Sequence, residues 1–287
     1  MLSGRSIYEI YKEVKIKLYD VIIAIAKKEF LDNVRNKWVI ILSLLFIILT
    51  CVTSYFGSVG KPGWHALHDT IRLIASPVNL IIPIIGLMLG YATIAGEREK
   101  GSLDLLIAYS PVRSEIIIGK FIGLATVLLT AMLIGFSMSG VIIGLNAGWT
   151  GWTSYLLFVG ESFLLGCTFL SISILLSSFF KTRSKAMGAT IFVWFLFTII
   201  WSMIVAGLLI ATFGTTGNHW EMLPHWYLIS HFFNPSMIYS SAVSMITSSS
   251  HTQLPWYYNI YSLNLANFVW IVICVVLSIT IFKKMDI

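Results

Sequence analysis

The chain has 287 residues and a net charge of +6, with 57% hydrophobic residues, only 11% charged residues and a mean hydropathy of +0.85. Soluble domains carry about 25% charged residues, so a chain this apolar would expose far too much hydrophobic surface to water. The composition excludes the soluble domain classes and predicts an all-α integral membrane protein, because its apolar runs do not alternate as the strands of a membrane barrel would.

Residues 1–37 are predicted to form a cytoplasmic segment that contains an amphipathic interfacial helix. Apolar residues recur at helical spacing through Val14, Leu18, Val21 and Ile25, while lysines and arginines occupy the other face. Such a helix would lie on the cytoplasmic leaflet, and a solvated cytosolic tail is the alternative. The first apolar run begins only after eight cationic residues, so it is predicted to be a retained span and not a signal peptide.

Six apolar runs are long enough to cross the hydrocarbon core, which takes roughly 20 residues. They cover Trp38–Phe56, Leu73–Ala95, Ile116–Leu145, Trp152–Phe180, Ala186–Phe213 and Asn264–Phe282. The third, fourth and fifth runs exceed the thickness of the bilayer, so we expect these helices to tilt, kink or project beyond it. Residues 38–287 are therefore predicted to form one transmembrane domain with six spans.

Lysine and arginine predict the orientation, because cytoplasmic loops carry an excess of both. Only Lys61 and Arg72 fall on one side of the predicted spans. The other 17 of these 19 residues fall in 1–37, 96–120, 181–185 and 283–284. Both termini are therefore expected on the cytoplasmic side of the cytoplasmic membrane. The same asymmetry accounts for most of the net charge, so no nucleic-acid partner is expected.

The cytoplasmic segment 96–115 is unusually charged, with three acidic and two basic residues in its first nine positions. We expect Gly96 to end the second spanning helix. Gly101 and Ser102 predict a bend, after which Ser102 can cap a short helix over Leu103–Tyr109. Pro111 would end that helix. The pattern predicts a short helix across the cytoplasmic end of the bundle, suited to dock a soluble partner.

The segment 214–263 has no lysine or arginine and contains three prolines. It is predicted to lie outside and to include a helical hairpin, interfacial or re-entrant, on the outer ends of the spans. Glycine pairs at four-residue spacing occur in the second and third spans and predict close helix packing, within the chain or between two copies. These pairs are Gly86 with Gly90 and Gly119 with Gly123.

Few residues suggest chemistry inside the membrane. Glu161 is the one ionisable residue well inside a predicted span, where a carboxyl either fills a polar pocket or takes part in transport. His65 and His68 could share a helix face and bind a metal, although interfacial histidines also occur as plain amphipathic surface. The three cysteines fall inside spans, where they suggest neither disulfides nor zinc.

The sequence lacks the common catalytic motifs. It contains no H-E-x-x-H, no G-x-S-x-G and no G-x-x-x-x-G-K-[ST] phosphate loop, so it is not predicted to be an enzyme or to bind ATP through such a loop.

The stretch AGEREKGSLDLLIAYSPVRSEIIIGKFIG resembles the signature of the type-2 ATP-binding-cassette (ABC) permeases, which read Gly-Glu-Arg-Glu, Gly-Thr-Leu, Leu-Leu, Pro-Val-x-Arg and Gly-Lys in turn. Ser102 stands at the threonine position. The matching residues are Gly96, Glu97, Arg98, Glu99, Gly101, Leu103, Leu105, Leu106, Pro111, Val112, Arg113, Gly119 and Lys120. The stretches KKEFLDNVRNKW, KTRSKA and NPSMIY are also similar to this family. The subgroup that the chain most resembles is the permeases for maturation of the copper enzyme nitrous-oxide reductase.

The resemblance implies a six-span permease that pairs as a homodimer and exports a substrate. A separate ATPase subunit would bind ATP and Mg, with no cofactor in this chain. The coupling helix would fall on Glu97–Tyr109, with the helix at 18–37 as a second contact, and Glu221 with the outer hairpin would cap the exit side. The residues alone leave three alternatives: a secondary transporter that uses Glu161, an intramembrane enzyme, or a membrane assembly or anchoring protein without transport.

Overall fold

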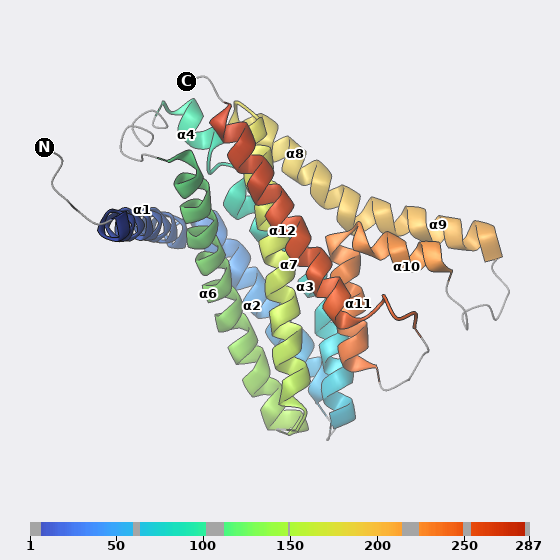
Figure 1. Cartoon of the computed structure of the whole chain (residues 1–287). Helices are drawn as coiled ribbons and strands as arrows, with labels where there is room; N and C mark the ends of the chain where they lie inside the picture. Colours follow the sequence, from blue (N-terminus) through green and yellow to red (C-terminus); the bar gives the residue numbers. More distant parts are fainter. Residues whose placement is uncertain are drawn as a thin grey trace, which may run out of the picture.

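The computed structural model describes residues 7–59, 64–101, 112–148, 150–213, 224–248 and 254–284, without the side chains of 7–19 and 64–66 (Figure 1). Every regular element in these ranges is a helix. Six helices are long and apolar enough to cross a membrane, as predicted: Lys37–Ser58, Leu67–Glu99, Arg113–Ala147, Trp152–Phe179, Arg183–Thr212 and Ile260–Lys283. The predictions for 102–111 and for Glu221 lie outside the described residues.

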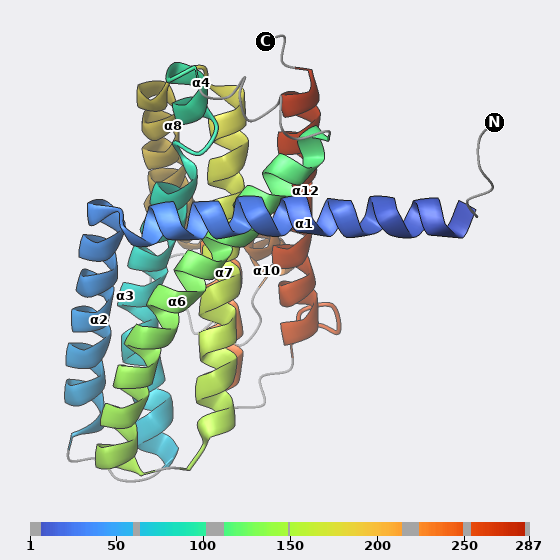
Figure 2. The same cartoon turned by 90° about the vertical axis from the view of Figure 1, so that its left-hand side faces the viewer.

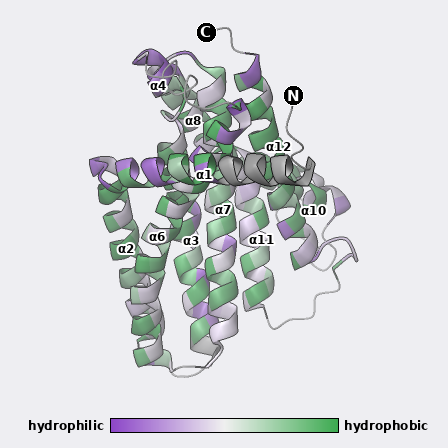
Figure 3. Ribbon diagram, turned by 60° about the vertical axis from the view of Figure 1, so that its left-hand side comes forward, coloured by the Kyte–Doolittle hydropathy of each residue, from purple (hydrophilic) through white to green (hydrophobic). Residues whose placement is uncertain are grey.

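The described helical elements follow one another along the chain. They are α1 (Ile7–Val34), α2 (Lys37–Ser58), α3 (Trp64–Gly90), α4 (Ala95–Glu99), α6 (Arg113–Ala147), α7 (Trp152–Phe179), α8 (Arg183–Phe195), the π-helix η1 (Leu196–Ile200), α9 (Trp201–Phe213), α10 (His225–Phe232), α11 (Pro235–Thr247) and α12 (Ile260–Lys283). In Figure 3 the ribbon of the long helices is mostly in the colours of hydrophobic residues, and hydrophilic residues gather on α4 and at the helix ends.

Helix α7 forms the centre of the bundle and packs against α3, α6, α11 and α12. Two glycines of α3 allow its backbone to approach α7 closely. A Cβ at Gly86 would lie 2.8 Å from the carbonyl oxygen of Gly166, and one at Gly90 would lie 2.7 Å from the Cβ of Ser173. Contacts this short are not tolerated, so glycine permits the two backbones to touch. The first predicted glycine pair therefore packs helices within the chain.

Helix α1 runs across the spans and lies against α6 (Figure 2). The second glycine pair forms this crossing, because a Cβ at Gly119 would lie 2.9 Å from the side chain of Ile25. At Gly123 it would lie 2.5 Å from the carbonyl oxygen of Ala26. In the described part of α1, Ile25 is buried while Lys27 is exposed.

The second span ends differently from the prediction. Helix α3 stops at Gly90, a turn follows over 91–94, and Gly96 lies inside the short helix α4 instead of ending the second helix. The turn is stabilised from outside, because the hydroxyl of Ser177 in α7 accepts hydrogen bonds from the backbone N–H groups of Ile94 and Ala95. The apolar run does not reveal this break, because the residues of the turn carry no charge and the first charge, Glu97, follows only after it.

The fifth span, formed by α8, η1 and α9, leans away from the rest of the bundle (Figure 1). Very few of its residues are buried, and it contains the five-residue π-helix Leu196–Ile200. The side chain of Asn234, at the start of α11, donates a hydrogen bond to the carbonyl oxygen of Phe197 in that π-helix. The same side chain caps α11 by accepting from the backbone N–H groups of Ser236 and Met237. Asn234 therefore joins α11 to the kinked span.

Between the fifth and sixth spans the structure places α10 and α11, joined by Phe233 and Asn234. Helix α11 packs against α3, α7 and α12, and α10 lies beside α11. The sixth span, α12, begins with a capping box between Asn259 and Ser262. Two helices thus occupy the region where a hairpin was expected, and its depth in the membrane stays a prediction.

Candidate functional site

The segment that carries the charged motif is tied to the bundle by a buried lysine. Lys120 of α6 is only 1% exposed. Its Nζ donates to the Oε1 of Glu29 in α1 at 2.6 Å and to the Oε1 of Glu97 in α4 at 2.8 Å. Lys28 adds a longer ion pair to Glu97, at 3.5 Å. This lysine–glutamate cluster joins three helices that are far apart in the sequence.

Two further contacts hold α4 against α8. A Cβ at Gly96 would lie 2.6 Å from the Nε of Arg183, so glycine leaves the space in which the guanidinium group packs. The Oε2 of Glu99 accepts a hydrogen bond from the backbone N–H of Arg183, at 3.0 Å. This places a carboxylate at the N-terminus of α8, where the helix dipole favours negative charge. Residues Glu97 and Glu99 of the motif therefore make contacts within the chain.

The far end of the same segment is attached to the sixth span. Arg113, at the start of α6, donates from Nη1 to the carbonyl oxygens of Phe282 and Lys283, at 3.0 and 2.8 Å. These carbonyls belong to the last turn of α12, which has no helical donor for them. Gly101 has a φ of +69°, a backbone conformation that glycine adopts without strain, and it ends the described part of the segment. Ser102, the other residue of the predicted bend, lies outside the described residues.

The remaining motif residues fall in two groups. Arg98 lies partly buried on α4, beside the exposed Lys100. Leu103, Leu105, Leu106 and Pro111 lie outside the described residues. The described anchors, at 94–99 and at 113, contact α1, α6, α7, α8 and α12. A force applied to this segment would therefore act on five helices at once.

A polar cavity of about 330 Å³ lies beside the lysine–glutamate cluster. Lys28 and Asp32 of α1 line one side of it, and Tyr91, Lys100 and Arg183 line another. The Oγ1 of Thr93 and the Nε of Arg183 are buried there without a hydrogen-bond partner among the described residues. The cavity therefore presents charged groups and unused polar atoms between α1 and α4.

Glu161 lies buried in α7, with 3% of its surface exposed. Its Oε1 accepts a hydrogen bond of 2.9 Å from the Nδ2 of Asn264 in α12. Its Oε2 and the Oδ1 of Asn264 are buried without partners among the described residues. Both side chains line a largely apolar groove of about 420 Å³ between α7 and α12. Glu161 thus has the polar partner that a structural role requires and also faces a space that a ligand could enter.

The described histidines pair with hydroxyl groups. His68 lies 3.3 Å from the Oγ of Ser154, and the Nδ1 of His225 lies 2.6 Å from the hydroxyl of Tyr257. His231 contacts the hydroxyls of Tyr258 and Ser241, and burial lowers its pKa to about 4, so it is neutral at pH 7. In the described part of the chain no three His, Cys, Asp or Glu side chains converge as metal ligands would. The side chain of His65 is not described, so a metal site with His68 stays a prediction.

Several residues of this region were missed in the sequence. Glu29, Ser177 and Arg183 were not singled out, although each contacts the motif. Lys120 offered a usable signal, because a lysine inside the predicted span Ile116–Leu145 needs a carboxylate partner. Asn234 offered a weaker one, since an asparagine before proline is a common helix cap.

Comparison with known proteins identifies relatives over most of the chain. Residues 23–287 match the family described as ABC-2 family transporter protein. The chain is 36% identical, over 222 residues, to the "Probable ABC transporter permease protein NosY" of Stutzerimonas stutzeri, with 75% of this chain and 78% of the relative covered. It is 34% identical, over 230 residues, to the protein of the same name from Pseudomonas aeruginosa, with 76% and 80% covered.

Proposed function

The chain belongs to the ABC-2 family of transporter proteins as a multi-pass membrane subunit, and from this premise we propose that it exports a substrate across the cytoplasmic membrane, using ATP that a separate ATPase subunit binds with Mg and hydrolyses. The observation that carries the proposal is the attachment of α4 to α1, α6, α7 and α8. A motif joined to so many helices can pass the movement of a docked ATPase to the spans.

The proposed ATPase surface consists of the segment 97–109 and the described part of α1. Glu29 and Lys28 of α1 belong to the same cluster as Glu97, so movement of either element displaces the other. The polar cavity between them offers room for side chains of the partner. ATP-driven approach of two ATPase subunits would push both elements and shift the spans between two discrete arrangements.

We propose a second copy of the chain as the other membrane partner. The fifth span exposes many large apolar residues on several faces, among them Phe192, Met203, Ile204 and Leu208. Lipid could cover such a surface, but a span that contacts its own bundle so little would be held in place better by a second copy. Glu221 and the outer helices would then cap the exit side of the dimer.

The function is tested by reconstituting the chain with its ATPase in liposomes. We expect the two proteins to purify together and the ATPase rate to rise when the permease is present. An ATPase that binds the chain but shows no change in rate would contradict coupling. Uptake driven by an ion gradient without ATP would instead support the secondary transporter.

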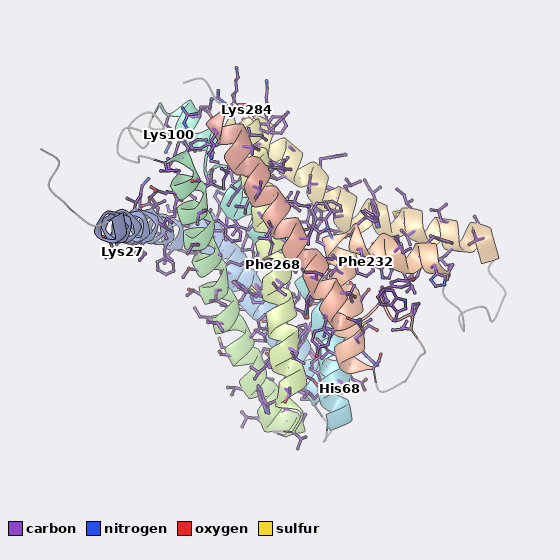
Figure 4. The ribbon with its side chains drawn as sticks, in the orientation of Figure 1. Lys27, His68, Lys100, Phe232, Phe268 and Lys284 are labelled. Atoms are coloured by element: carbon purple, nitrogen blue, oxygen red, sulfur yellow. The ribbon has the colours of Figure 1, made fainter. Side chains whose placement is uncertain are left out.

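The proposed orientation predicts which positions an external reagent reaches. Lys100 and Lys284 lie at one end of the bundle and His68 at the opposite end (Figure 4). With the lysines in the cytoplasm, the substitution Ser249→Cys should react with an impermeant thiol reagent added to whole cells, and Lys100→Cys should react only after lysis. The reverse pattern would overturn the topology.

Glu161 separates the proposed exporter from the secondary transporter. Because its partner is the neutral amide of Asn264, we expect Glu161→Gln to keep most of the ATP-driven transport, since an amide can replace the hydrogen bonds of a neutral carboxyl. Glu161→Leu, which leaves Asn264 without a partner, serves as the comparison. Complete loss of transport in Glu161→Gln, with assembly and ATPase coupling intact, would show that the carboxyl carries a proton or binds a cation.

A further inference from the structure

An open, partly polar cavity of about 400 Å³ lies at the surface of the bundle, where α3, α11 and the π-helix region meet. The two helices contribute its polar lining in two rows. These residues are Arg72, Ser76 and Asn79 of α3, and Ser240, Ser244 and Thr247 of α11. Each row follows the spacing i, i+4, i+7, which places its members on one face of a helix. The polar faces of both helices therefore line the same cavity.

The two rows run antiparallel and are joined at both ends. At one end Arg72 donates from Nε to the Oγ1 of Thr247 and from Nη2 to its carbonyl oxygen, at 3.0 and 2.8 Å. At the other end the Nδ2 of Asn79 donates to the Oγ of Ser240 at 3.3 Å. Seven residues of helix separate these ends, a depth of about 10 Å. The cavity thus extends from near the start of the second span well into it.

The charge of the lining has one sign. Among the described residues of the lining, Arg72 is the only charged one, and the other polar members carry hydroxyl or amide groups. A guanidinium group has five N–H donors, of which Thr247 uses two. Asp69, outside the lining, forms an ion pair with Nη1 at 4.0 Å, and both side chains are about half exposed. The distance is too long for a hydrogen bond. Donor groups therefore remain for a ligand.

The third wall comes from the fifth span. Thr198 of η1 lines the cavity opposite the two rows. Asn234 fixes this wall by its hydrogen bond to the carbonyl oxygen of Phe197. A π-helix is a frequent feature of functional sites, since it redirects side chains within a span. Ser240 and Ser244 are exposed, so the cavity is open on the side that the bundle does not cover.

We propose that this cavity binds a small anion, so that the substrate class of the exporter is anionic; this inference rests on the proposed function. The guanidinium of Arg72 attracts negative charge, and the hydroxyls of Ser76 and Ser244 can donate to an anion beside it. The hydroxyls of Ser240 and Thr247 already donate to backbone carbonyls and serve to shape the site. The same cation repels cationic substrates. The volume admits ligands up to the size of a small organic anion.

The anion site is tested by the charge selectivity of thiol modification at the cavity. The substitution Ser244→Cys places a thiol in the lining, and Trp256→Cys places one at a highly exposed position on the proposed outer side. Modification is measured with an anionic and with a cationic methanethiosulfonate reagent, against the background of the unsubstituted chain. We expect the anionic-to-cationic rate ratio at Ser244→Cys to exceed that at Trp256→Cys by roughly tenfold.

Arg72 is then tested as the source of the selectivity. Adding Arg72→Gln should abolish the preference, whereas Arg72→Lys should retain it because the charge remains. Benzoate should protect Ser244→Cys from the reagent, and choline at the same ionic strength should not. Equal rate ratios at the two positions, or no protection by benzoate, would overturn the anion site. Because these readouts need no ATPase, they leave the exporter proposal to be judged by its own experiment.

Discussion

Replacing Lys120 with methionine is expected to destabilise the protein by about 3–5 kcal/mol, because it leaves two carboxylates without their buried cation. Lys120 donates to Glu29 and Glu97 at 2.6 and 2.8 Å, and the lysine side chain is almost completely buried. Methionine has a similar length, so packing against α1 changes little and the effect reports the charge. The measurement is the midpoint of unfolding in detergent with increasing urea.

The matched control is Lys100→Met, which removes an exposed lysine from the same region and should change the stability by less than about 0.5 kcal/mol. A triple variant that combines Lys120→Met with Glu29→Gln and Glu97→Gln removes the stranded charges. It should recover much of the lost stability, since a balanced neutral cluster avoids an unpaired buried charge. If Lys120→Met unfolds at the same urea concentration as Lys100→Met, the cluster contributes nothing to the fold.

The same cluster changes what is expected of Glu97. From the sequence alone the crowded charges of the segment 96–115 indicate a partner protein, and exposed ion pairs contribute only about 0–1 kcal/mol. The structure adds a partner within the chain, because Glu97 binds a buried lysine. The substitution Glu97→Ala should therefore impair folding as well as docking, so it is a poor test of coupling.

The number of spans could be predicted because it depends on apolar length, which a sequence displays directly. The end of the second span could not, because Ser177 holds the turn at Ile94 from a helix about 80 residues away in the chain. The length of the fifth span predicted that it would tilt or kink. The position of its π-helix was not predictable, because the hydrogen bond that joins it to the bundle comes from Asn234, at the start of another helix.

The candidate site was likewise predictable only in part. Residues of the charged motif were recognised from their order along the chain. Their anchors were not, because Glu29 and Lys120 meet only where α1 crosses α6 at Gly119 and Gly123. The cavity between α3 and α11 was also missed, although Arg72, Ser76 and Asn79 recur at helical spacing at the start of an apolar span. A search for polar faces within predicted spans would have found that row, but not the facing row of α11.

Leu106→Asp is expected to uncouple the ATPase while leaving the permease folded. Leu106 lies outside the described residues, between anchors at Glu97 and Arg113 that the substitution does not touch. If the segment 97–109 sits in a cleft of the ATPase, a carboxylate at this position would be buried without a partner. A loss of roughly 2–5 kcal/mol at such an interface corresponds to a decrease in affinity of about 30-fold or more.

The ATPase that purifies with the tagged chain, and its rate of ATP hydrolysis, measure the loss. Leu254→Asp, the same change at a partly exposed leucine on the proposed outer side, should leave both unchanged. Unfolding midpoints equal to that of the unsubstituted chain would exclude misfolding as the cause. If Leu106→Asp binds the ATPase and supports transport normally, the segment 97–109 is not the coupling contact. Docking would then have to rest on α1 and the polar cavity beside it, where Lys28→Glu, at a half-exposed lysine, becomes the next variant to test.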